Sequence, residues 1–143
     1  LFGSPLKTQS GQGGMMMTLK EMRAMVTRYL ECYNNFDVAG IMALVHPEIE
    51  FQNVCNGVVS AQASGEEQFR NLAELSTHLF SEREQLLKEY STDGESATIE
   101  VEYIGVLASD IEDGPQAGET IHLRGRSTFQ FRDGKIFRIV DMS

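Results

Sequence analysis

A carboxylate and an amide in apolar company are the side chains of this sequence best suited to chemistry. Asp141 alternates with Ile139 near the end of the chain, and Asn53 alternates with Phe51 and Ile49. Residues two positions apart in a strand share a face, so we expect both polar groups to point towards apolar neighbours. Desolvation raises the pKa of a carboxyl group in such a place unless hydrogen bonds hold its charge. Asp141 is therefore either a general base or a hydrogen-bonded structural carboxylate, and Asn53 either orients a ligand or satisfies backbone groups.

Three tyrosines and a serine could complete such a site. Tyr29 and Tyr33 are one turn apart on the apolar side of a predicted helix, and Tyr103 is on the apolar face of a predicted strand. Their rings suit core packing, while their hydroxyl groups could reach a rim or donate a proton. Ser127 is a single polar group on an apolar strand face, where a small side chain leaves room for a ligand. We expect the pocket to be lined by Phe51, Ser127, Phe129 and Tyr33.

The sequence patterns typical of metal sites, phosphate-binding loops and nucleophile motifs are absent. No two histidines have the spacing of metal ligands, and no cluster of carboxylates suggests a metal site. No glycine-rich phosphate loop follows a strand, and no serine or cysteine nucleophile motif is present. We therefore predict a site without a metal or an organic cofactor.

Charge and hydropathy limit the partners. The formal net charge of -9 argues against a nucleic-acid or anionic-membrane surface, because both require a positive patch. No apolar run approaches the roughly 20 residues of a membrane helix, and no signal peptide is visible. The two cysteines, Cys32 and Cys55, are too few for a disulfide framework and are expected to be reduced. These features predict a cytoplasmic protein that binds neither nucleic acid nor membrane.

The elements that must position these side chains begin with helices. Residues 1–17 lack periodicity and are interpreted as a flexible tail or a non-native remnant, which leaves one domain over residues 18–143. Thr18 and Glu21 form a capping-box pattern before an amphipathic helix over residues 18–34. Asp37 is placed to cap a second, short helix that reaches Val45, and Ser64 to cap a third that reaches Phe80.

Strands fill most of the remainder. Alternation predicts strands over residues 49–54, 86–90, 97–107, 121–132 and 135–142, with an acidic loop over 109–118. Asn56-Gly57, Asp93-Gly94 and Asp133-Gly134 are turn signals. The face with Glu100 and Glu102 is expected to pair with Arg124 and Arg126 on the outside of the sheet. The order predicts an α+β domain, with three N-terminal helices packed on a mostly antiparallel sheet.

Two stretches carry a family likeness. The segment TRYLECYNNFDVAGIMALVHPEIEFQN resembles the opening of the nuclear-transport-factor-2-like superfamily, which includes the SnoaL-like polyketide cyclases, and RGRSTFQFRDGKIFRIVD resembles its closing hairpin. The resemblance covers about residues 18–143. It implies a curved sheet wrapped against the helices as a cone with an internal pocket, and a homodimer. It does not by itself imply one reaction, because the fold hosts many.

Enzyme patterns of that superfamily match in part. Compared with ketosteroid isomerases, Tyr29 matches the helix tyrosine, while Asn53 and Ser127 stand where two catalytic aspartates belong. SnoaL-type aldol cyclases also rely on an aspartate at the Ser127 position. Limonene-1,2-epoxide hydrolases are similar at Asn53, which matches their water-holding asparagine, and at Asp141, which matches their base. Phe51 replaces their tyrosine, and Tyr103 and Gly105 replace their arginine and second aspartate, so Tyr103 would be the acid.

Two functions remain open. The first is a cofactor-independent hydrolase, isomerase or cyclase that acts by acid–base chemistry on a small, apolar, oxygenated metabolite. Asp141 would then be the base, Asn53 would orient water or substrate, and Tyr29 or Tyr103 would donate a proton. The second is a non-catalytic ligand-binding or dimerising module with the same pocket. In both cases we expect a homodimer through the outer face of the sheet.

Overall fold

The computed structural model describes residues 17–143. Its helices are α1 (Leu19–Asn34), α2 (Val38–Met42) and α3 (Glu66–Leu79). Its strands are β1 (Val45–Cys55), β2 (Val58–Ser64), β3 (Phe80–Thr92), β4 (Ser96–Leu107), β5 (Thr120–Arg132) and β6 (Lys135–Met142). The tail predicted over residues 1–17 falls outside the described residues, apart from Met17.

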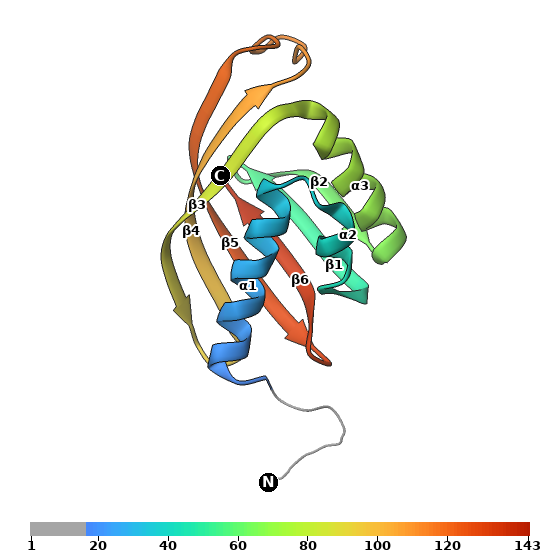
Figure 1. Ribbon diagram of the computed structural model, residues 1–143, viewed down its shortest axis with the longest axis vertical. Coiled ribbons are helices and arrows are strands. Elements are labelled where there is room, and N and C mark those ends of the chain that lie inside the picture. Colours follow the sequence, from blue (N-terminus) through green and yellow to red (C-terminus); the bar gives the residue numbers. More distant parts are fainter. Residues whose placement is uncertain (1–16) are drawn as a thin grey trace, which may run out of the picture.

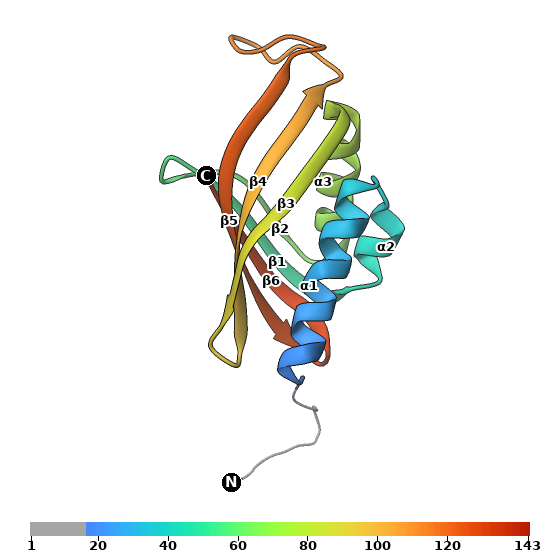
Figure 2. The ribbon, with the colours of Figure 1, turned by 60° about the vertical axis from the view of Figure 1, so that its left-hand side comes forward.

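The six strands form one open sheet in the order β2-β1-β6-β5-β4-β3. All neighbours are antiparallel except β1 and β6, which are parallel. Tight turns explain the hairpins: at Asp133-Gly134 both residues have positive φ, of 54° and 74°, which favours this pair of residues. The predicted α+β class and mostly antiparallel sheet are confirmed, and Figures 1 and 2 show that the sheet is strongly twisted.

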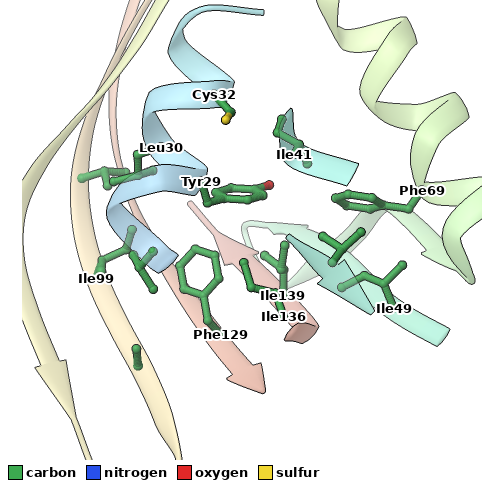
Figure 3. Close-up of a cluster of buried hydrophobic side chains, with 14 of the residues drawn as sticks. Tyr29, Leu30, Cys32, Ile41, Ile49, Phe69, Ile99, Phe129, Ile136 and Ile139 are labelled. Atoms are coloured by element: carbon green, nitrogen blue, oxygen red, sulfur yellow. The ribbon is translucent and has the colours of Figure 1, made fainter. Parts of the chain in front are cut away.

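The helices cover one face of the sheet, as Figure 2 shows most clearly. The core lies between that face and α1, where Val26, Phe129 and Ile139 are almost fully buried. Figure 3 shows Phe129 and Ile139 between α1 and the strands, with Ile41 of α2 and Phe69 of α3 at the other end of the cluster. Removing such side chains from water is the main stabilising contribution, of roughly 1.5–3 kcal/mol each.

The start of α1 agrees with its sequence pattern. Glu21 N–H donates to Thr18 Oγ1 at 3.0 Å, and Thr18 N–H donates to Glu21 Oε1 at 2.8 Å, which completes the capping box. The helix then buries Met22, Val26 and Tyr29 along one face. The cap therefore fixes the N-terminal end of α1. This helix carries two of the candidate tyrosines, Tyr29 and Tyr33, in its C-terminal half.

The other two helices differ from prediction. Helix α2 has five residues and ends at Met42, and Val45 already begins β1. Ser64 does not cap α3 but ends β2, and Gly65, with φ of 87°, stands at the N-cap position without a side-chain hydrogen bond. A glycine tolerates this left-handed conformation, which lets the chain turn sharply from strand to helix.

Two strands were missed or underestimated from sequence. Strand β2 lies at the edge of the sheet and is mostly exposed, so it lacks the alternation of a half-buried strand. Strand β3 spans thirteen residues rather than the five predicted. Its register with β4 shifts between Phe80 and Glu82 and again between Leu87 and Glu89, and such bulges interrupt the period of two.

The outer face of the sheet carries the predicted pairs of opposite charge. Glu100 is opposite Arg126 and Glu102 is opposite Arg124 in the register of β4 and β5. Arg126 Nη2 donates to Glu100 Oε2 at 2.9 Å, with both side chains about half exposed. No helix within residues 17–143 is long and apolar enough to cross a membrane.

Candidate active site

Three polar side chains lie in one row across the sheet. In the register of the strands, Asp141 on β6 is directly opposite Asn53 on β1 and Ser127 on β5. Because β6 lies between β1 and β5, the candidate base has one of these residues on each side. The sequence places these residues 88 and 14 positions away from the base along the chain, and sheet topology brings them together.

Asp141 combines a hydrogen bond with an unfavourable setting for charge. Ser127 Oγ donates to Asp141 Oδ1 at 2.6 Å, and Ser127 is 4% exposed. Burial raises the pKa of Asp141 to about 6, although the hydrogen bond from Ser127 opposes that rise. A carboxylate with this pKa is ionised at pH 7 and is a stronger base than an ordinary aspartate.

Asn53 is beside Asp141 without a hydrogen bond to it. The Asn53 side-chain nitrogen donates to Ser60 Oγ at 2.9 Å, and Ser60 Oγ donates to the backbone carbonyl of Asn53 at 3.2 Å. These contacts hold Asn53 at the point where the pairing of β1 with β2 shifts by a residue. Asn53 is thus positioned next to the base by the sheet and oriented by the edge strand.

Tyr29 on α1 brings a buried hydroxyl within electrostatic reach of Asp141. The side chain is 7% exposed, and its ring packs edge to face on Phe129, with centroids 5.5 Å apart. Burial, and then the nearby Asp141 charge, raise the pKa of Tyr29, so the hydroxyl stays protonated. No hydrogen bond to this hydroxyl is formed within residues 17–143, and Figure 3 shows its oxygen directed towards the side of Phe69. Tyr29 is therefore a free donor close to Asp141.

Tyr33 and Tyr103 form a second, coupled donor pair. Their hydroxyl oxygens are 2.9 Å apart, and their rings meet nearly perpendicular at 6.1 Å. Burial raises the pKa of both residues further above the ordinary tyrosine value, so both hydroxyls remain protonated at neutral pH. One of the two protons lies between the oxygens, and the other is available to a ligand.

These groups open into a cavity of about 540 Å³ between the sheet, α1 and α3. Apolar side chains predominate at its mouth, where Leu75 and Leu123 are 69% and 43% exposed. Phe129 is not among the lining residues, because it is 1% exposed and packs beneath Tyr29 in the core. The other candidate residues line the cavity together: Tyr29, Tyr33, Phe51, Asn53, Tyr103, Ser127 and Asp141.

Among the lining residues that sequence reasoning did not single out is a cation, Arg83. It lies on β3 opposite Gly105 of β4 and is 6% exposed. Arg83 shares its side of β3 with Gln85, and because both residues are polar, no apolar alternation marks this part of the strand as inward-facing. The sole sequence signal was an arginine among apolar and polar residues next to a predicted strand, which is too common to be diagnostic.

Metal ligands do not converge in the described part of the chain. Within it, no three His, Cys, Asp or Glu side chains lie close enough together to hold a metal ion. Among the polar groups of the cavity are those that a proton-transfer site requires: one carboxylate of raised pKa, three tyrosine hydroxyl donors and the Asn53 amide.

Comparison with known proteins places this geometry in a family context. The model of the SnoaL-like domain matches residues 26–139. No curated protein matches the chain by sequence. The fold is similar to a candidate SnoaL-like polyketide cyclase from Jannaschia sp. CCS1, with a TM-score of 0.74, 13% identity and coverage of 92% of this chain and 90% of that one.

Two further structures have the same fold. A candidate polyketide cyclase from Xanthomonas campestris pv. campestris has a TM-score of 0.71 and 22% identity, covering 87% of this chain and 90% of that one. An LEH-like epoxide hydrolase from M. tuberculosis has a TM-score of 0.68 and 16% identity, covering 87% of this chain and 83% of that one. Similarity at these identities concerns the fold alone.

Proposed function

The chain belongs to the family of SnoaL-like domains, and we propose that it is a cofactor-independent enzyme that moves a proton on a small, apolar, oxygenated molecule held in its cavity. The curved sheet and the helices would form the cone around that ligand. The observation that carries the proposal is the Asp141 carboxylate, whose pKa burial raises to about 6 in a cavity lined mainly by apolar side chains.

Each candidate residue has a role in this proposal. Asp141 takes a proton from a carbon or from a water molecule, and the Ser127 hydrogen bond keeps its carboxylate oriented. Asn53, its neighbour across the strands, orients the attacking water or the substrate carbonyl. Tyr29, or the Tyr33–Tyr103 pair, donates a hydrogen bond or a proton to the oxygen where negative charge develops.

Two reaction classes suit this arrangement. Isomerisation or cyclisation of a ketone begins when the base removes a proton from carbon, and hydrolysis of an epoxide begins when it removes one from water. Among proteins of similar fold are candidate polyketide cyclases and an LEH-like epoxide hydrolase, which makes both classes worth testing. The free thiols Cys32 and Cys55 suit the reducing cytoplasm, where we propose that the protein acts.

The experiment separates the two classes. Exchange of the α-protons of 2-tetralone in D2O, followed by NMR, reports abstraction from carbon, and incorporation of 18O from labelled water into limonene 1,2-epoxide reports hydrolysis. We expect one reaction to be accelerated, with a rate that rises with pH through about 6. Asp141→Asn should reduce the rate by roughly 10²–10⁴-fold.

Matched variants make this result specific. Asp133→Asn removes a carboxylate whose side chain is 63% exposed and outside the cavity, so it should leave the rate unchanged. Tyr29→Phe removes the free hydroxyl while its ring stays packed on Phe129, so it should lower the rate without loss of stability. If neither reaction is accelerated although 2-tetralone binds, the enzymatic proposal is wrong.

The second candidate function is a non-catalytic ligand-binding or dimerising module. Its support is the tight Ser127–Asp141 hydrogen bond, which suits a structural carboxylate as well as a base. We also propose a homodimer through the outer face of the sheet. That face carries both negative and positive side chains, such as Glu100 and Arg126, and could therefore complement a second copy of itself.

A further inference from the structure

A buried cation lines the cavity without a carboxylate partner. Arg83 is 6% exposed, and none of the ion pairs formed within residues 17–143 includes it. Arginine is rarely buried this deeply unless an acid neutralises it, because the guanidinium loses its hydration. The charge of Arg83 therefore requires an explanation beyond packing.

Part of that explanation is structural. Arg83 Nε donates to the Tyr33 carbonyl at 2.9 Å, and Nη1 donates to the carbonyl and the hydroxyl of Ser76 at 3.3 and 3.0 Å. The guanidinium carbon lies 3.7 Å from the centroid of the Tyr33 ring and 4.4 Å from that of Phe36. These contacts tie the ends of α1 and α3 to β3 and offset part of the desolvation.

None of these hydrogen bonds uses the remaining nitrogen, Nη2, although the guanidinium is also close enough to the Tyr33 side chain to lower the pKa of its hydroxyl. A guanidinium has five N–H donors, and the hydrogen bonds formed within the described chain use those on Nε and Nη1. The only fully enclosed polar side-chain atom without a partner in that part of the chain is the Tyr90 hydroxyl, so Nη2 is not fully enclosed by protein atoms. Since Arg83 lines the cavity, the side of Nη2 that protein atoms leave open faces the cavity.

Arg83 and Asp141 mark two separate parts of the cavity. They lie on β3 and β6, with β4 and β5 between those strands in the sheet. The three tyrosines lie within the electrostatic reach of both charges, because Asp141 raises and Arg83 lowers the pKa of Tyr29, Tyr33 and Tyr103. A ligand that contacts both residues would pass along these hydroxyl groups.

We propose that Arg83 binds the carboxylate of the ligand, so that the protein acts on small apolar carboxylic acids whose reactive end lies beside Asp141. The inference rests on the proposed function and specifies its substrate class. Nη2 supplies the charged donor, the Tyr33–Tyr103 pair supplies a neighbouring neutral donor, and the apolar lining accommodates the hydrocarbon part. Charge-assisted hydrogen bonds of this kind are about twice as strong as neutral ones.

The test compares a carboxylate with its neutral analogue. Calorimetry at pH 7.5 would measure the dissociation constants of 4-phenylbutyrate and 4-phenylbutyramide, which share one hydrocarbon part. We expect the wild-type protein to bind the carboxylate about ten-fold more tightly or better. Arg83→Met should reduce its affinity to that of the amide, and Arg83→Lys should retain part of the preference. Arg28→Met removes an exposed arginine of α1 and should change neither affinity.

Each outcome decides the inference. Equal binding of the two compounds by the wild-type protein would overturn it even if Arg83→Met does not fold, and would leave the proposed apolar ligand site standing. A preference for the carboxylate that persists in a folded Arg83→Met protein would also overturn it. If neither compound binds, both the carboxylate inference and the proposed apolar ligand site on which it rests are wrong.

Discussion

Asp141 is subject to opposing effects that make it both a good base and an unfavourable residue for stability. The hydrogen bond from Ser127 favours the carboxylate, whereas burial disfavours it more strongly. An aspartate in the unfolded chain has the ordinary pKa of 3.8, so the folded protein holds this proton more tightly than the unfolded chain does. Ionised Asp141 therefore lowers the free energy of unfolding above pH 6.

The first consequence at this scale concerns Asp141→Asn. The penalty of the ionised carboxylate is fully present above about pH 6 and is relieved as the pH falls from 6 to 3.8. We expect the variant to be more stable than the wild type at pH 7.5 by roughly 1–3 kcal/mol, and the difference to shrink towards pH 4. Urea unfolding at both pH values measures this. A variant less stable at pH 7.5 would show that the carboxylate is structural.

Helix α1 is the element that carries most of the donors. Tyr29 and Tyr33 both belong to it, and the backbone carbonyl of Tyr33 receives the Arg83 hydrogen bond. Its far end is tied to β3 by Asn34, whose amide nitrogen and oxygen bond the carbonyl and N–H of Gln85 at 3.3 and 2.8 Å. The position of the hydroxyl groups thus depends on both ends of one helix.

The N-terminal end of α1 can be tested through its cap. Thr18→Ala removes the acceptor for Glu21 N–H and leaves that donor without its partner. We expect the free energy of unfolding to fall by about 0.5–2 kcal/mol, while Thr18→Ser, which keeps the oxygen, stays close to the wild type. Thermal unfolding of the three proteins measures this. An equal loss in both variants would attribute the effect to the threonine methyl group.

On the scale of the whole molecule, the two faces of the sheet differ in burial and in charge. One face packs on the helices and surrounds the cavity, and the other carries exposed charges together with partly buried Val140 and half-exposed Met142. A symmetric dimer through this outer face would leave the mouth of the cavity, with Leu75 and Leu79, open to a ligand.

The proposed homodimer predicts a mass. Light scattering should give about twice the 16.0 kDa of the chain. Arg126→Glu places like charges beside Glu100 on that face and should shift the equilibrium towards the monomer, whereas Arg28→Glu on α1 should not. A wild-type mass equal to one chain at high protein concentration would contradict the dimer.

Local patterns were sufficient to predict much of the fold. The capping box of α1, the Asp37 cap of α2 and the long strands β4, β5 and β6 follow from short-range rules of spacing, so the sequence alone determined them. The apolar setting of Asp141 and the cross-strand charge pairs also followed from alternation. Each of these features depends on residues within a few positions, or on one period carried along a strand.

Tertiary structure decided which residues of neighbouring strands lie opposite one another. The row of Asn53, Asp141 and Ser127 exists because parallel β1 and antiparallel β5 flank β6, and no local pattern specifies that order. Arg83 lies in a part of β3 that local patterns did not predict as a strand, and its neighbours Tyr33 and Ser76 come from two different helices. Long-range strand pairing sets the direction of a side chain wherever local alternation gives no signal. The position of the Arg83 charge in the cavity could therefore be identified only from the folded chain.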